Sequence, residues 1–80
     1  MAVLRLFAGA REAAGTGRDD LPGRTVGEVL DAARARYGAP FTDVLAHCQI
    51  WCNGEPSEAS QPVSDGDEVA VLPPVSGGGS

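Results

Sequence analysis

The feature that most constrains this chain is one amphipathic helix, predicted from Val26 to about Tyr37. Thr25 can cap its first turn, and Glu28 can reach back to complete a capping box. Gly38 is typical of a residue that ends a helix. One stripe of the helix is apolar, and we expect this stripe to pack on a sheet. The stripe consists of Val26, Val29, Leu30, Ala33 and Tyr37.

Strand-like segments precede and follow this helix. In the first segment, Leu4, Leu6 and Ala8 share one side of a strand, which we expect to face the core. In the last segment, Val69 and Val71 are expected to face the core. The pattern predicts strands at 2–8, 18–21, 48–52 and 68–72, helical turns around 10–14 and 41–46, and a loop with at most a short strand at 55–63.

This order of elements predicts the fold class. The order is two strands, a helix and two further strands, in which the helix can cover one face of a mixed sheet. This is the β-grasp arrangement, although other small α+β folds share the pattern. We therefore predict an α+β protein of the β-grasp (ubiquitin-like) fold, with a mixed sheet of four or five strands and one main helix on one face. The folded domain is expected to span residues 1–75, and a flexible glycine-rich tail residues 76–80.

Charge and composition argue against several classes of function. The net charge is −5 and every basic residue is an arginine, which argues against a nucleic-acid partner and removes lysine-based phosphate binding and Schiff-base chemistry. The longest apolar run is far shorter than the roughly 20 residues of a membrane span, and the N-terminus lacks the pattern of a signal peptide. We therefore expect a cytoplasmic protein with no membrane partner.

Two cysteines and a neighbouring histidine invite a disulfide or a metal interpretation. Cys48 and Cys52 stand four residues apart in a strand-like segment, which separates them by roughly 13 Å, too far for a disulfide. We expect both thiols to be reduced and buried. Together with His47 they lack the paired ligand spacing of zinc sites, and no nucleophile with its base is found. We expect neither a metal site nor a stand-alone enzyme.

Both ends of the chain carry motifs that point to one family. After the last strand, Pro73 and Pro74 stop sheet pairing, and three glycines at 77–79 make a thin end that can enter a narrow channel. The segments DGDEVA at 65–70 and LPPVSGG at 72–78 resemble the C-terminal end of the MoaD/ThiS sulfur-carrier family. The N-terminal motifs are also similar to that family, so the resemblance spans nearly the whole chain. These motifs are LFA at 6–8, RE at 11–12 and GT at 15–16.

The resemblance implies a carrier that binds no cofactor of its own. Its terminal glycine, aligned here on Gly78 with Gly77 before it, would be adenylated by an enzyme similar to ubiquitin-activating enzymes, which uses ATP and Mg²⁺. Sulfur would then replace the adenylate and give a thiocarboxylate. In the molybdopterin pathway the tail would next enter the large subunit of molybdopterin synthase, which uses the sulfur to build the dithiolene of the molybdenum cofactor.

The sequence departs from the family at its very end. Family chains normally stop at the second glycine, whereas this one continues with Gly79 and Ser80, so Gly78 as written has no free carboxylate. Three explanations stay open: a C-terminal protease removes two residues, the last residues are an addition to the natural chain, or Gly79 becomes the terminus after loss of Ser80 alone. We predict that the chain ending at Ser80 is inactive until it is processed.

An apolar patch at the base of the tail is the expected partner-binding surface. Phe7 and Leu72 should lie on the face opposite the helix, with Trp51 on the same side, although Trp51 could instead pack under a loop. Arg11 either pairs with an acidic group of the partner or is a solvated charge. The interface is expected to continue into the chain that follows the last strand, at Pro73, Pro74 and Val75.

The sequence leaves alternatives open. A carrier for thiamin, cysteine or a sulfur-containing natural product would use the same tail, although LPPVSGG favours the molybdopterin branch. From a different class, a non-catalytic β-grasp interaction module could use Gly-Gly-Gly-Ser as the start of a flexible linker. The oligomeric state is also open.

Overall fold

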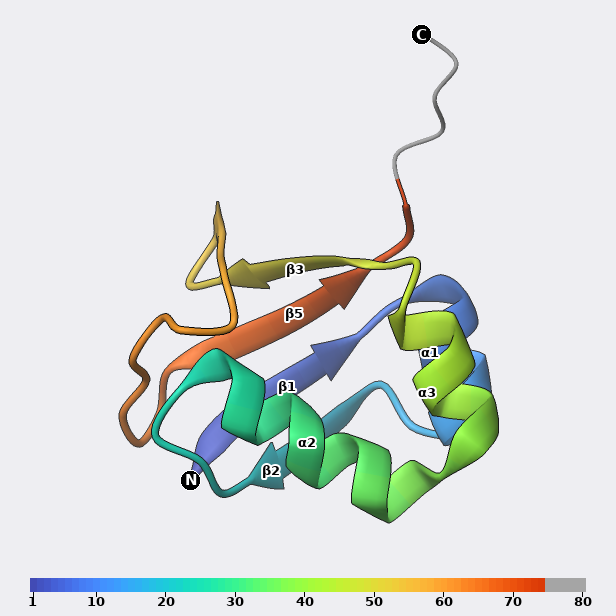
Figure 1. Ribbon diagram of the computed structural model, residues 1–80, viewed down its shortest axis with the longest axis horizontal. Coiled ribbons are helices and arrows are strands. Elements are labelled where there is room, and N and C mark those ends of the chain that lie inside the picture. Colours follow the sequence, from blue (N-terminus) through green and yellow to red (C-terminus); the bar gives the residue numbers. More distant parts are fainter. Residues whose placement is uncertain (75–80) are drawn as a thin grey trace, which may run out of the picture.

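A mixed sheet forms the centre of the computed structural model, which describes residues 1–74 (Figure 1). The strand order is β2-β1-β5-β3-β4, in which β1 and β5 run parallel and every other pair is antiparallel. The α+β, β-grasp prediction is confirmed, whereas the expected boundary between domain and tail lies outside the described residues. The elements are β1 (Ala2–Leu6), α1 (Ala8–Ala14), β2 (Arg18–Leu21), α2 (Val26–Tyr37), α3 (Ala39–Leu45), β3 (Gln49–Cys52), β4 (Glu55–Pro56) and β5 (Glu68–Leu72).

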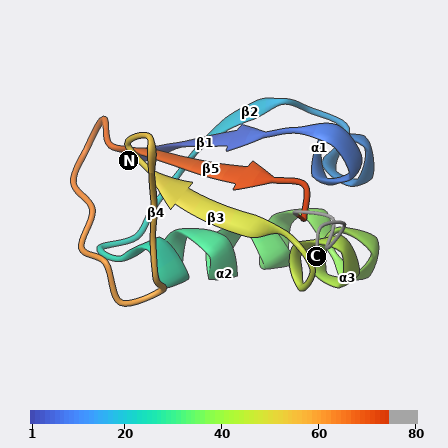
Figure 2. The same cartoon turned by 90° about the horizontal axis from the view of Figure 1, so that it is seen from above.

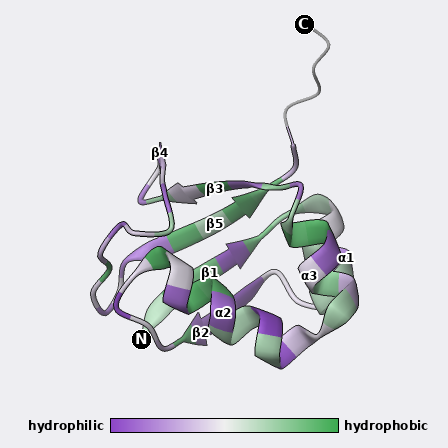
Figure 3. Cartoon of the chain, viewed as in Figure 1, coloured by the Kyte–Doolittle hydropathy of each residue, from purple (hydrophilic) through white to green (hydrophobic). Residues whose placement is uncertain are grey.

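Helix α2 begins and ends where its sequence predicts. The Thr25 hydroxyl oxygen accepts a hydrogen bond from the Glu28 amide at 3.1 Å. The Glu28 carboxylate reaches back to the amide of Arg24 at 2.8 Å, one residue earlier than the cap residue of an ordinary capping box. Figure 3 shows polar and apolar residues interleaved along this helix. Four residues of the predicted stripe are buried, and Tyr37 is half-buried at its end.

The core lies between the sheet and helices α2 and α3, which cover the same side of it (Figure 2). Leu4, Leu6, Val69 and Val71 point into this core and are fully buried, as the alternation predicts. Phe41 of α3 is also fully buried, a position that the sequence pattern did not single out. Within residues 1–74 no helix is both long and apolar enough to span a bilayer.

The first strand is shorter than predicted. It ends at Leu6, and the next residue, Phe7, still donates its amide to the Val71 carbonyl at 3.2 Å. Ala8 then takes a positive φ of 50° and begins α1, so its side chain is exposed rather than directed into the core. The turn is what moves Ala8 out of the strand register. Helix α1 lies at the end of the sheet beside α3 (Figure 1).

The segment after α2 also differs from its prediction. Helix α3 begins at Ala39 rather than near residue 41, because Pro40 is accommodated in its first turn, where a missing backbone N–H costs nothing. Strand β3 begins at Gln49, one residue later than predicted.

The two cysteines occupy different environments. Both are free, and Cys52 is buried in β3 as expected. Cys48 precedes the strand and is only half-buried, with its thiol donating to the Val44 carbonyl at 3.2 Å, so the prediction that both are buried is wrong for Cys48. Burial raises the pKa of both thiols.

A polar cluster joins β2 to the end of α2. The Tyr37 hydroxyl donates a hydrogen bond to the Asp19 carboxylate, and the Arg36 guanidinium contacts the same carboxylate oxygen at 2.9 Å. Burial of the phenol and its hydrogen bond to Asp19 raise the pKa of Tyr37 to about 12.

Tyr37→Phe is expected to lower the free energy of unfolding by about 1 kcal/mol at neutral pH, because one hydrogen bond to a carboxylate is lost. The raised pKa means that the folded state holds the phenolic proton more tightly. This stabilisation is therefore complete below pH 10 and is lost as the pH rises from 10 towards about 12. Urea unfolding at a series of pH values should show this decline in the wild type and a shallower one in the variant. If the free energy of unfolding fell equally steeply with pH in the two proteins, Tyr37 would not be the group that titrates between pH 10 and 12.

Candidate functional site

The site predicted from the sequence lies where β5 ends. This strand runs parallel to β1, and both finish at the same edge of the sheet (Figure 1). The chain then continues through Pro73 and Pro74, which are exposed. The remaining predicted tail positions, Val75, Gly77, Gly78 and Gly79, lie outside the described residues, so their predicted roles remain predictions.

The side chains of the predicted apolar patch share the face of the sheet that α2 and α3 leave uncovered. Antiparallel pairing sets Trp51 opposite Ala70 and Gln49 opposite Leu72, so Trp51 and Leu72 project from the same face. Phe7 follows β1 in an extended conformation, continues its alternation and is 39% exposed. Trp51 and Leu72 are half-buried. We call Phe7, Trp51 and Leu72 the apolar patch.

Trp51 lies one alternation step further from the tail than Leu72. Its indole N–H donates to the Gln49 side-chain oxygen at 3.2 Å, so the polar edge of the ring is satisfied on the surface of the sheet. The register directs Trp51 to the uncovered face, and the side chain is half-buried there, so its neighbours cover part of its surface.

An arginine-lined groove of about 630 Å³ adjoins the apolar patch. Its basic lining consists of Arg5 on β1, Arg11 on α1 and Arg18 on β2, and Phe7 and Glu68 also border it. Arg11 is exposed, and its guanidinium group lies beside Gly17, where an added Cβ would stand 3.4 Å from the Nε atom. We call this feature the arginine groove.

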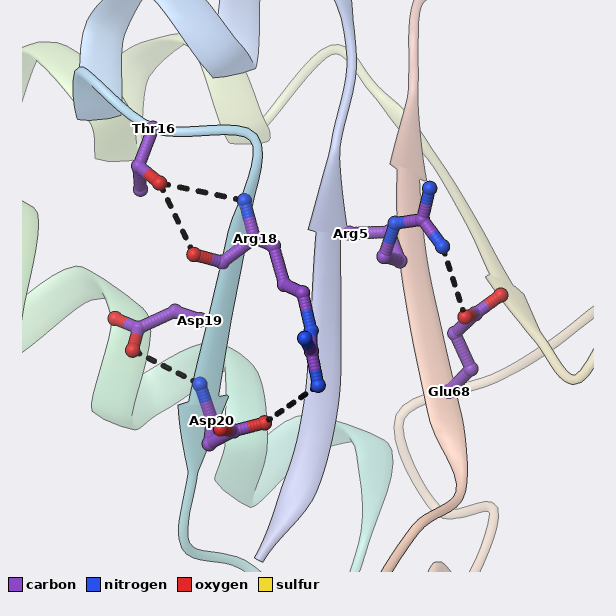
Figure 4. A network of polar contacts seen from close by, with 6 residues as sticks. All are labelled: Arg5, Thr16, Arg18, Asp19, Asp20 and Glu68. Atoms are coloured by element: carbon purple, nitrogen blue, oxygen red, sulfur yellow. Dashed lines mark hydrogen bonds and ion pairs between the residues drawn. The ribbon is translucent and has the colours of Figure 1, made fainter.

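Two of the three arginines of the arginine groove form ion pairs (Figure 4). Arg5 contacts the Glu68 carboxylate at 3.2 Å, and Arg18 contacts the Asp20 carboxylate at 3.7 Å. The Arg5 guanidinium also lies 5.9 Å from the centre of the Phe7 ring, within range of a cation–π interaction. The groove therefore touches the apolar patch through Phe7.

Sequence reasoning named only Arg11 among the basic residues of the groove. Alternation along β1 places Arg5 on the same face as Phe7, and this signal could have found it. Arg18 could not be found in this way, since its position depends on the register between β1 and β2. No cluster of three or more His, Cys, Asp or Glu side chains in the described part of the chain could hold a metal ion.

A comparison with known proteins identifies the family of this chain. The sequence profile of the ThiS family matches residues 4–78, which is nearly the whole chain. The chain belongs to the ThiS family. The MoaD/ThiS family membership predicted from the motifs at the two ends of the sequence is thereby confirmed.

Relatives of this ThiS-family chain carry two kinds of name. Small archaeal modifier protein 1 of Haloferax volcanii is 38% identical over 84 residues, covering 92% of this chain and 97% of the relative. The molybdopterin synthase sulfur carrier subunit of Anopheles gambiae is 39% identical over 83 residues, covering 94% and 89%. The solution structure of small archaeal modifier protein 1 from Methanosarcina acetivorans superposes with a TM-score of 0.81 at 30% identity, covering 94% and 93%.

Proposed function

We propose that this protein carries sulfur on its C-terminal glycine for molybdopterin synthesis, as the small subunit of molybdopterin synthase. The observation that carries the proposal is the LPPVSGG segment, which begins at the last residue of the central strand β5 in a chain of the ThiS family. The sulfur-carrier name of the Anopheles gambiae relative supports the molybdopterin branch.

The protein acts by presenting its tail rather than by catalysis. Free carboxylates are poor electrophiles, and adenylation of the terminal glycine supplies a leaving group that sulfur can displace. The partner enzyme stabilises the charge that develops in this step. We propose that ATP and Mg²⁺ are bound by this adenylating enzyme, and that the carrier binds no cofactor and works in the cytoplasm.

The apolar patch is the proposed contact with both partner enzymes. It lies beside the end of β5, so a protein that packs on it receives the tail directly into its active site. An exposed aromatic ring flanked by half-buried apolar side chains is typical of the centre of an interface. Pro73, Pro74 and Val75 then extend the contact toward Gly78.

The pathway is tested by supplying the sulfur-loaded carrier, prepared with Gly78 as its last residue, to purified acceptor enzymes. The large subunit of molybdopterin synthase with its sulfur-free pterin substrate is expected to form the dithiolene. A thiazole synthase and a sulfur-dependent cysteine synthase serve as the comparison. Sulfur transfer to either of these, with none to the pterin, would assign the carrier to that other pathway.

The chain that ends at Ser80 is expected to be inactive without processing. A serine terminus presents a bulkier tip and a carboxylate displaced from Gly78 by two residues. Chains ending at Gly78, Gly79 and Ser80 can be compared for ATP-dependent thiocarboxylate formation by mass spectrometry. We expect the Gly78 chain to react and the Ser80 chain to remain unchanged unless a C-terminal protease is added. A thiocarboxylate formed on Ser80 would refute this expectation.

A second candidate function is protein modification, favoured by the name of the Haloferax volcanii relative. In this case an amine of another protein attacks the activated glycine and forms an amide bond with loss of the adenylate. The chain itself contains no lysine, so its own side chains supply no acceptor amine. Branched peptides that join Gly78 to a lysine of another protein would favour this role, whereas free thiocarboxylate alone favours the sulfur carrier.

A further inference from the structure

We propose that the arginine groove is a docking site for an acidic segment of the adenylating enzyme, whose carboxylates replace Glu68 as the partner of Arg5. This inference rests on the proposed function and adds the chemistry by which the partner is recognised.

The first observation is a like-charge pair across two strands. The register of β1 and β2 sets Arg5 directly opposite Arg18, so both guanidinium groups project from the same face. Like charges in directly opposed positions destabilise a sheet. Arg11 adds a third positive charge to the same groove from α1, and no acidic side chain within residues 1–74 forms an ion pair with it.

The second observation is the contrast between the groove and the rest of the protein. Three arginines and one glutamate line the groove, and Asp20 pairs with Arg18 at its border, so these five side chains carry a net charge of +1, whereas the whole chain carries −5. The remainder of the chain therefore carries −6. The acidic surface of the protein repels an acidic partner, whereas the arginine groove attracts it. The partner is therefore guided to the groove in one orientation. A nucleic acid would meet the same repulsion over a far larger area.

The third observation is that a carboxylate already occupies part of the arginine groove. Glu68 already places a carboxylate against Arg5 at 3.2 Å, and both side chains are almost half exposed. Such an exposed ion pair contributes little to stability, so a carboxylate from a partner can replace it at small cost. Arg11 and Arg18 can contact further carboxylates of the same segment, because Arg18 is 65% exposed and Arg11 is exposed.

The position of the groove links recognition to delivery of the tail. Along the uncovered face the order is an acidic row at Asp20 and Glu68, then Arg5 with Arg18, then Phe7 with Leu72. An enzyme segment bound to the arginines therefore lies beside the apolar patch and the end of β5. Electrostatic attraction guides the encounter, and the apolar patch completes the contact.

Charge-reversal variants test the proposal through the KM for the carrier in ATP–pyrophosphate exchange by the adenylating enzyme of the same organism. With chains ending at Gly78, Arg11→Glu is expected to raise KM about tenfold with little change in kcat. Arg24→Glu makes the same charge change outside the groove and should change KM less than about twofold. Equal effects of the two variants would show that only overall charge matters and would overturn the proposal.

Three further variants separate the recognition of the partner from effects on folding. Glu68→Gln removes the internal competitor and should lower KM about two- to threefold, whereas Glu58→Gln in the exposed loop should leave KM unchanged. Arg18→Gln should raise KM without lowering the thermal unfolding midpoint, because it relieves the like-charge pair with Arg5. An increase of KM in Glu68→Gln would contradict the displacement of Glu68.

A titration of the protein with an acidic peptide, without any enzyme, tests the arginine groove separately from the sulfur-carrier function. Adding hexaglutamate to the wild-type protein should shift the side-chain N–H resonances of Arg5, Arg11 and Arg18 more than those of the other three arginines. Uniform shifts at all six would overturn the groove as an acidic docking site. Absence of pyrophosphate exchange with the otherwise unchanged chain ending at Gly78 would instead count against the sulfur-carrier function.

Discussion

Replacing both Gly77 and Gly78 with valine in a chain that ends at residue 78 is expected to reduce adenylation at least about a hundredfold. Under the proposed function, the reacting carboxylate reaches the ATP-binding site of the adenylating enzyme through a narrow channel, where a branched side chain prevents the close backbone approach that glycine allows. Small misplacements of a reacting group cost on the order of a hundredfold in rate. The measurement is single-turnover pyrophosphate release with the adenylating enzyme in excess.

A control variant outside the tail shows whether the loss of adenylation is specific to the tail. Ser60→Val adds a similar side chain to an exposed loop and should leave the rate unchanged. Ser60→Val should unfold at the same temperature as the wild type, because Ser60 is exposed, and the unfolding temperature of the double valine variant is measured beside it. A double valine variant that reacts as fast as the unchanged chain ending at Gly78 would show that the glycines do not enter a confined site.

Gly23→Ala is expected to lower the free energy of unfolding by about 3 kcal/mol. Gly23 has a φ of 152°, and a Cβ at this position would stand 2.7 Å from the Val29 amide nitrogen and 2.9 Å from its Cγ2 atom. The clash is with the backbone of α2, so a change of side-chain rotamer cannot relieve it. The loop before α2 would have to move away from the helix.

Gly66→Ala is the matched control for this variant. Its φ of 86° is similarly unfavourable for alanine, but no atom lies within 4 Å of the position of an added Cβ. We expect Gly66→Ala to cost about 1 kcal/mol from backbone strain alone. Urea unfolding of both variants, with equal denaturant slopes, gives the difference directly. Equal destabilisation of the two would show that the contact with Val29 is not what requires glycine at position 23.

Local signals were sufficient for much of the fold. The cap at Thr25, the apolar stripe of α2 and the alternation in β5 each depend on residues close together in the chain, and all three are confirmed. The uncovered face was predicted for the same reason, since alternation alone places Phe7 and Leu72 opposite the core. The family was also readable, because its motifs are continuous segments.

Features that depend on tertiary contacts were not predictable from these patterns. The length of β1 is decided by the turn at Ala8, and the exposure of Cys48 by where α3 ends. The arginine groove requires the pairing of Arg5 with Arg18, which no local pattern specifies. It was therefore missed, although Arg11 had been named by itself.

Sulfur loading of the tail can be measured as the intact mass of the chain ending at Gly78 after incubation with the adenylating enzyme, ATP and a sulfur donor. We predict that one oxygen is exchanged for one sulfur, and that fragmentation places the sulfur on the Gly78 carboxyl group. An unchanged mass, or sulfur bound to the thiol of Cys48 or Cys52 instead, would contradict this prediction.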